Sequence, residues 1–121
     1  SRLNPAAEPA FPITANLDYI YEHFDEFKLL ICKSEGTSYE SFVHNMVEIE
    51  TEETLDFIDV LRRQGKEVPN MEWEVCHMIV SGMFTGIFEL IRHDMKKENA
   101  RKFIAELRDF YIAGWSKILG F

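Results

Sequence analysis

Glutamate and histidine recur along this 121-residue chain at spacings that place both side chains on one face of a helix. The segment Glu74-Val-Cys-His77 has the ExxH spacing that helical di-iron sites use. Such a site needs a second ExxH segment, which the sequence lacks. Glu40/His44 and Glu89/His93 have i,i+4 spacing and need no metal, because such pairs form on helix surfaces. We therefore predict no metal site and no cofactor.

Two glutamates project from the apolar side of the longest expected helix, which runs from about residue 39 to 64. With Phe42 at zero and a turn of 100° per residue, Glu53 and Glu50 project at about 20° and 80°. A carboxylate in an apolar arc needs a partner, or it must take up a proton. Either the helix is bent or the carboxylate pairs internally, for example with Arg108, or it lines a cavity and contacts a polar or cationic ligand. The sequence leaves these interpretations open.

His77 projects into the apolar arc of the next helix, as a satisfied core histidine or as a ligand contact. Cys32 and Cys76 lack CxxC spacing, and we expect both to be reduced and buried. The sequence has no Gly-rich phosphate loop, GxSxG elbow or HExxH motif. We therefore expect no catalytic residues, with a small α-helical enzyme using Glu53 and His77 as an alternative.

The composition is that of one globular domain, with 46% hydrophobic residues and ten phenylalanines. The formal net charge of −8 argues against direct binding of nucleic acid, which requires basic side chains. No segment has the pattern of a signal peptide. The longest nearly charge-free apolar run, residues 75–88, is too short to span a bilayer. These features predict a cytoplasmic chain without a membrane partner.

Apolar periodicity predicts an all-α fold, an antiparallel helical bundle of about five helices. Residues 1–12 carry three prolines and read as an irregular arm, and Ser1 could remain from cloning. We expect helices from about 14 to 24, 26 to 33, 39 to 64 and 71 to 92, and a last helix after a turn at 93–96. The expected boundary signals are a cap at Thr14 or Asn16, a capping box at 37–40, a C′ glycine at Gly65, and caps at Asn70 and Asp94.

The last two helices carry apolar arcs about twice as wide as the roughly 100° stripe of a helix that packs on one side. Such helices must be covered from two sides, by the chain's own core and, we expect, by a second copy of the chain. Gly82 and Gly86 give the GMFTG segment a small surface, which indicates close approach of a neighbouring helix. That helix could lie in the same subunit or in a dimer partner.

The segment Phe110-Tyr-Ile-Ala-Gly-Trp115-Ser-Lys-Ile-Leu-Gly120 resembles the closing helix of TetR/AcrR-type transcriptional regulators. The layout of residues 21–30, residues 34–42 and the two long helices that follow is similar to the same family. The resemblance covers residues 13–121 and corresponds to the C-terminal half of such a regulator. The N-terminal helix-turn-helix DNA-binding domain of the family is absent from this chain.

The resemblance implies an effector-binding and dimerisation domain of a repressor, in which a small molecule in the helical core controls DNA binding by the N-terminal domain. The expected partners are a homodimer mate, held by the last two helices, and a small hydrophobic or cationic effector. DNA would be bound only through the N-terminal domain. A helical protein-interaction module without a ligand is the other alternative.

The expected ligand pocket lies between residues 13–33, the helix at 39–64 and the inner face of residues 71–93. Its predicted lining is Phe27, Phe42, Met46, Ile49, Glu53, Phe57, His77 and Phe84. The predicted dimer interface is Ile79, Gly82, Gly86, Leu90, Tyr111, Ile112, Trp115 and Leu119.

Overall fold

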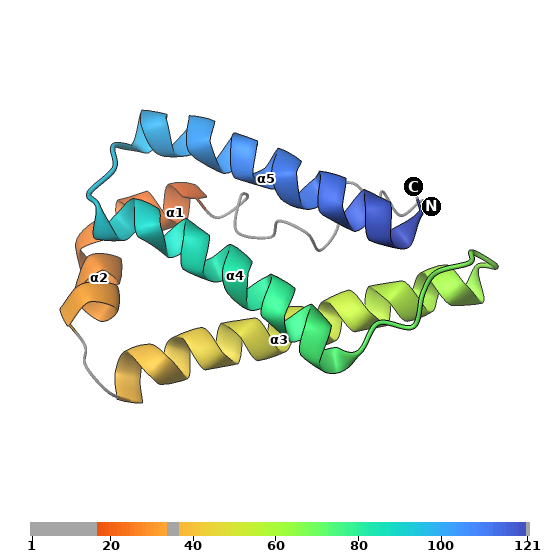
Figure 1. The fold of residues 1–121 in the computed structure, drawn as a ribbon. Helices are drawn as coiled ribbons and strands as arrows, with labels where there is room; N and C mark the ends of the chain where they lie inside the picture. The colour runs from red at the N-terminus through yellow and green to blue at the C-terminus, as the bar shows by residue number, and fades with distance from the viewer. Residues whose placement is uncertain (1–16, 34–36, 121) are drawn as a thin grey trace.

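The computed structural model describes residues 17–33 and 37–120, and these form helices joined by short connections (Figure 1). The elements are α1 (Leu17–Glu22), α2 (Phe24–Lys28), the π-helix η2 (Leu29–Lys33), α3 (Thr37–Arg63), α4 (Trp73–Arg92) and α5 (Lys97–Leu119). The described part of the chain contains no strand, which confirms the all-α prediction. The expected arm at residues 1–12 and the caps at Thr14 and Asn16 lie outside the described residues.

The core lies where α4 crosses α3, with α1, α2 and η2 packed at one end (Figure 1). The expected wide apolar arc of α4 is confirmed, because its buried side chains cover about half of the helix. They are Cys76, Val80, Met83, Phe84, Ile87, Phe88, Leu90 and Ile91. By length and composition α4 could also cross a membrane, because it extends beyond the run at 75–88. Here it is the central helix of the core.

Helix α3 presents only one side of its predicted apolar arc to the core. The buried positions of α3 are Val47, Glu50, Thr51, Thr54, Ile58 and Leu61. At 100° per residue they centre about 130° from the direction of Phe42. Ile49, at the other edge of the predicted arc, is 58% exposed. Helix α4 is the main helix that packs along α3, with η2 and the end of α5 adding smaller contacts, so only about half of the predicted apolar arc is covered.

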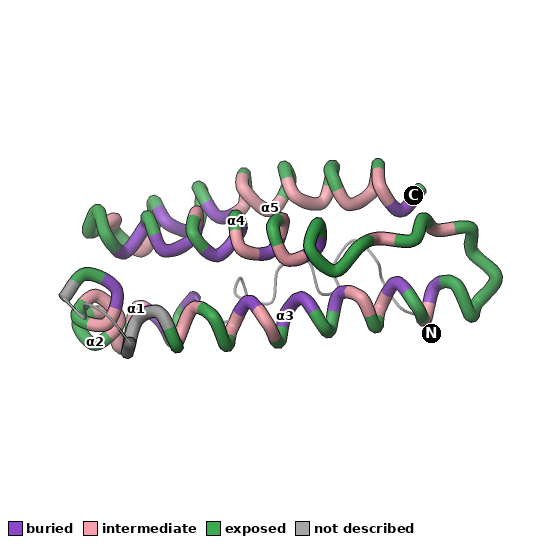
Figure 2. The backbone as a smooth tube through the Cα atoms, turned by 60° about the horizontal axis from the view of Figure 1, so that its bottom comes forward, coloured by how far each residue is buried: buried purple, intermediate pink, exposed green. Residues whose placement is uncertain are grey.

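Helix α5 lies beside α4 and buries little of its own surface (Figure 2). Its fully buried residues are Ala100, Ile104 and Leu119, at its two ends. Near its first turn, Lys97 Nζ and Arg101 Nη2 lie 2.7 and 2.6 Å from Asp18 Oδ1. The Tyr21 hydroxyl donates to the Met95 carbonyl oxygen at 2.7 Å. These polar contacts hold the start of α5 against α1.

The helix ends agree with the sequence patterns in part. Gly65 has φ of +90°, and the amides of Gly65 and Lys66 donate to the carbonyls of Arg62 and Leu61, so the C′ glycine is confirmed. The predicted cap at Asn70 is wrong, because α4 starts at Trp73 after Glu72. The cap at Asp94 is also wrong: α5 begins after Lys96, and Asp94 instead forms an ion pair with Lys28.

Candidate ligand-binding site between α3, α4 and α5

The most unusual polar group in the described part of the chain is the Glu50 carboxylate. Glu50 lies on the face of α3 that packs against α4 and is 5% exposed. Its Oε2 atom is buried with no hydrogen-bond partner among the described residues, and the same holds for Oγ1 of Thr51. Burying an unpaired carboxylate destabilises a protein, so this group calls for a functional explanation.

The surroundings of Glu50 favour its neutral form. Burial is the first cause and the negative charge of Glu53 is the second, and together they raise the pKa of Glu50 from 4.5 to about 7. Burial and the charge of Glu50 likewise raise the pKa of the fully buried Cys76 thiol to about 11. Near neutral pH the interior therefore holds a carboxyl group that changes charge readily, beside an inert thiol.

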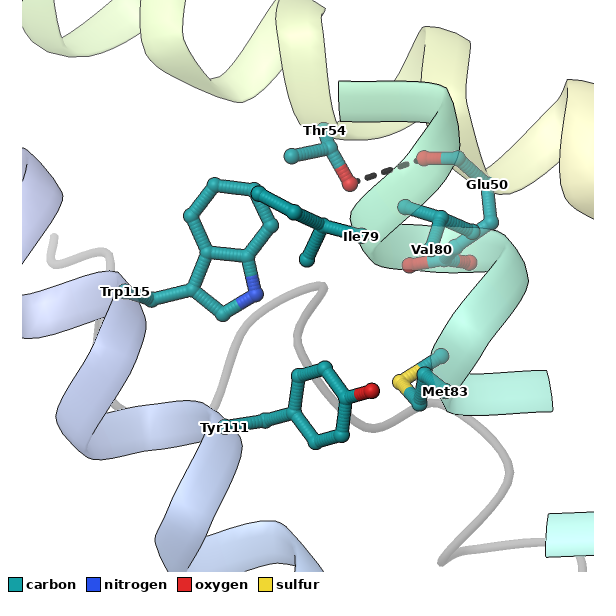
Figure 3. A pocket seen from close by; sticks show the side chains of 7 residues that line it. All are labelled: Glu50, Thr54, Ile79, Val80, Met83, Tyr111 and Trp115. Carbon is teal, nitrogen blue, oxygen red and sulfur yellow. Dashed lines mark hydrogen bonds between the residues drawn. The ribbon is translucent and has the colours of Figure 1, made fainter. Parts of the chain in front are cut away.

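Glu50 lines a cavity of about 10 Å³ between α3, α4 and α5 (Figure 3). This volume is that of roughly one water molecule. The Thr54 hydroxyl donates to the Glu50 backbone carbonyl at 2.8 Å, so it serves the main chain and not the carboxylate. The lining residues are Glu50, Thr54, Ile79, Val80, Met83, Tyr111 and Trp115.

A wider groove of about 430 Å³ lies on the other side of the same side chains, between α4 and α5. It is lined by Ile79, Phe110, Tyr111, Ala113, Gly114, Trp115 and Ile118. Ile79, Tyr111 and Trp115 line both spaces, so these three side chains separate the inner cavity from the outer groove. Figure 3 shows Tyr111 and Trp115 reaching from α5 toward α4, with Glu50 and Thr54 on the α3 side.

The predicted ligand-lining residues are not gathered around one cavity. Phe27, Phe42 and Phe84 belong to a filled aromatic cluster: the ring centroids of Phe27 and Phe42 are 6.2 Å apart, and Phe88 lies 6.0 Å from Phe42 and 6.1 Å from Phe84. Met46 packs against the same core.

Other members of the predicted lining lie elsewhere. Phe57 packs against a second cluster around Ile58, Leu61 and Leu119. Ile49 and Glu53 are exposed. The expectation that Glu53 faces the apolar interior is therefore wrong, and Glu50 is the carboxylate that the fold buries.

The charged partners proposed from the sequence are also different. Arg108, the internal partner suggested for the buried glutamate, instead pairs with its neighbour on α5: its Nη2 atom lies 3.7 Å from Asp109 Oδ1. His77 stacks on Trp73 with ring centroids 4.7 Å apart, and its Nε2 lies 3.9 Å from Glu48 Oε2. The carboxylate within ion-pair distance of His77 is thus Glu48 and not the Glu53 of the enzyme alternative.

The glycines of α4 bring α5 close within the same chain. A Cβ on Gly82 would lie 3.3 Å from the Tyr111 hydroxyl oxygen, and one on Gly86 would lie 3.6 Å from Leu107 Cδ2. Of the predicted dimer residues, Leu90 and Leu119 are buried inside the chain. Ile79, Tyr111, Ile112 and Trp115 are half-buried.

The apolar side chains that α4 and α5 expose are ones the prediction did not include. Phe110 and Met78 are each 70% exposed, and Val75 and Phe103 are about half exposed. Phe103, Leu107, Phe110 and Gly114 form a seam along α5 at helical spacing. Phe103 and Phe110 are exposed, whereas Leu107 packs against the core, so the spacing alone does not identify the outer face.

Metal-ligand geometry is absent from the described residues, among which no three His, Cys, Asp or Glu side chains cluster. His93 Nε2 lies 3.1 Å from Glu89 Oε1, within hydrogen-bond distance at the end of α4. His44 is exposed, and the side chain of Glu40 lies outside the described part of the chain. Cys32 is exposed, so the expectation that both cysteines are buried is wrong for Cys32.

Comparison with models of protein families, with characterised proteins and with solved structures found no match to this chain. A buried carboxyl group, a small cavity and an adjoining apolar groove are the parts of a binding site.

Proposed function

We propose that the chain is the effector-binding and dimerisation domain of a TetR-like transcriptional regulator, a cytoplasmic homodimer whose small-molecule ligand controls DNA binding by an N-terminal domain. The observation that carries this proposal is Glu50 Oε2, which is buried without a hydrogen-bond partner among the described residues, at a cavity that α5 helps to line. A purely structural helical core gains nothing from such a group, because an apolar side chain of similar size would be more stable there.

The side chains between the inner cavity and the outer groove could couple ligand binding to dimerisation. Tyr111 and Trp115 contact the inner cavity on one side and the outer groove on the other. A ligand that enters between α4 and α5 has to move these side chains, and α5 buries few residues that would resist such a shift. A change in α5 then changes the surface that it offers to a second copy.

The exposed face of α4 and α5 suits such a copy. Phe110, Met78, Val75 and Phe103 place large apolar side chains on adjoining helices, and Gly114 has open space around its Cβ position. Exposed apolar surface of this kind marks an interaction site in soluble proteins. In the four-helix arrangement of the proposed dimer, this face packs against its own copy.

Sedimentation equilibrium at micromolar concentrations tests the dimer. We expect the wild type to be dimeric and Phe110→Glu to be a folded monomer, because that side chain is 70% exposed within the chain. Leu29→Glu is the matched control: Leu29 is a 60% exposed apolar side chain in η2, at the α1–α2 end of the chain, and its replacement should leave the dimer intact. A monomeric wild type would contradict the proposal.

The same exposed face also supports the second candidate, a helical protein-interaction module without a ligand. That function leaves the Glu50 cavity without a role. It predicts a monomeric chain whose melting temperature no small molecule raises. Under the regulator proposal, a ligand at about 100 times its dissociation constant should stabilise the domain by about 2.7 kcal/mol.

A further inference from the structure

We propose that the Glu50 cavity and the α4–α5 groove form a single site for a primary alkylammonium ligand with an aromatic or aliphatic body. The ammonium group binds Glu50, and the apolar body lies in the groove. This inference rests on the proposed effector function and names its ligand class.

The charge of the ligand follows from what surrounds Glu50. The seven residues that line its cavity include no lysine, arginine or histidine. The charged group that acts on Glu50 is Glu53, and the buried Cys76 lies close enough for Glu50 to affect its thiol. Among the described residues, the inner end of the site therefore has a carboxylate and no cation, so a positively charged ligand group is its complement.

The size of the cavity restricts the cationic group. About 10 Å³ admits a group the size of one water molecule. An ammonium group at the end of an alkyl chain is that small, whereas a trimethylammonium or guanidinium group is not. An ammonium group also offers three donors, and Glu50 Oε2 is an acceptor without a partner in the described part of the chain.

The outer groove defines the rest of the ligand. Its volume of about 430 Å³ falls in the usual range of roughly 300–1,000 Å³ for small-molecule sites. Its lining is apolar and aromatic, with Phe110, Tyr111 and Trp115 as the large side chains. Aromatic rings bind flat apolar groups and also attract a nearby cation through their faces.

Ile79, Tyr111 and Trp115 act as the gate between the two spaces, since they line both. Tyr111 has room to lie there because residue 82 is a glycine: a Cβ at that position would be 3.3 Å from its hydroxyl oxygen. Entry of the ammonium group requires these side chains to move apart. The contact that selects the ligand is thus coupled to the position of α5.

Isothermal titration calorimetry with tryptamine tests the inference, on the full 121-residue chain at about pH 8, where Glu50 is ionised and an alkylamine is still protonated. Two analogues with the same indole body complete the series: tryptophol, which has a neutral hydroxyl group, and the N,N,N-trimethyl derivative of tryptamine, which has a bulky cation. We expect tryptamine to bind at least tenfold more tightly than either analogue, as loss of a charge-assisted hydrogen bond implies. Equal affinity for tryptamine and the trimethyl derivative would overturn the inference.

Glu50→Gln and its matched control, Glu53→Gln, locate the binding. Glu53 is one helical turn away and exposed, so Glu53→Gln removes the same charge outside the cavity. We expect Glu50→Gln to weaken tryptamine at least tenfold and to leave tryptophol unchanged, and Glu53→Gln to change tryptamine binding less than threefold. Unchanged tryptamine affinity in Glu50→Gln would refute the site. If Glu50→Gln did not fold, the relative affinities of the three ligands for the wild type would still test the inference.

The outcomes separate this inference from the proposed function. If the wild type is a dimer and binds tryptophol or a fatty acid but not tryptamine, the ligand class is wrong and the effector function stands. If the wild type is a monomer and no compound in a broad screen raises its melting temperature, both proposals fail.

Discussion

Glu50→Gln removes a buried charge and keeps the shape of the side chain, and we expect it to change how stability depends on pH. Glu50 has a pKa of about 7 in the folded chain and 4.5 in the unfolded chain. Between these values the folded state binds more protons than the unfolded state, so wild-type stability falls as the pH rises. Below about 4.5 and above about 7 this group contributes no further change.

The magnitude follows from the two pKa values. Each tenfold difference in proton affinity is worth about 1.4 kcal/mol, so the fall across the window is at most about 3 kcal/mol. The glutamine variant lacks this fall. Its amide brings N–H donors that also need partners, which costs about 1–3 kcal/mol at every pH. The difference in unfolding free energy between variant and wild type should therefore rise by about 2–3 kcal/mol from pH 4.5 to 8.

Urea unfolding of both proteins at matched concentration across this pH range measures the difference directly. Subtracting the two curves cancels the contribution of the other carboxylates. Glu53→Gln serves as the control, and its difference from the wild type should change far less because its side chain is exposed. A constant difference between Glu50→Gln and the wild type from pH 4.5 to 8 would show that Glu50 is solvated in the folded chain.

Three further predictions concern substitutions in α4 and α5. Gly86→Ala should stabilise the domain by about 0.5–1 kcal/mol, because the added Cβ meets Leu107 at an ordinary 3.6 Å. Gly82→Ala should stabilise the domain less, because its Cβ would lie 3.3 Å from the Tyr111 hydroxyl oxygen. The full stabilisation should return when Tyr111 is replaced by Phe. A double-mutant cycle by urea unfolding that shows no coupling between the two positions would refute this contact. Phe88→Ala, in the core, should cost about 3–5 kcal/mol, whereas Phe103→Ala should cost under about 1 kcal/mol, and thermal unfolding ranks the two.

The architecture could be predicted from the sequence because helical periodicity is strong in this chain. The wide arc of α4 and the glycine stop after α3 are both visible in the residues alone. The N-caps of α4 and α5 were misplaced because Asn70 and Asp94 are good capping residues that the chain uses in other ways. Asn70 accepts a hydrogen bond from Arg62, and Asp94 pairs with Lys28. At both residues, contacts with other segments outweighed the local preference for capping a helix.

The candidate site was harder to predict because periodicity gives directions but not partners. Glu53 at about 20° and Glu50 at about 80° both lie inside the apolar arc of α3, so the pattern alone does not decide which carboxylate points inward. The structure buries Glu50 because α4 covers the part of that arc that contains it. The same uncertainty affected α5, where Tyr111 and Trp115 turn toward α4 and Phe110 turns outward.

The uneven burial of α5 has a consequence for hydrogen exchange. The amides of α3 and α4 lie in the main core and should exchange only through global unfolding, whereas the middle of α5 packs only through partly buried side chains such as Leu107 and Tyr111. Its middle turns, around residues 105–114, can open without disturbing the α3–α4 pair. These turns should therefore exchange fastest among the long helices, and any partner or ligand that covers α5 should slow them first.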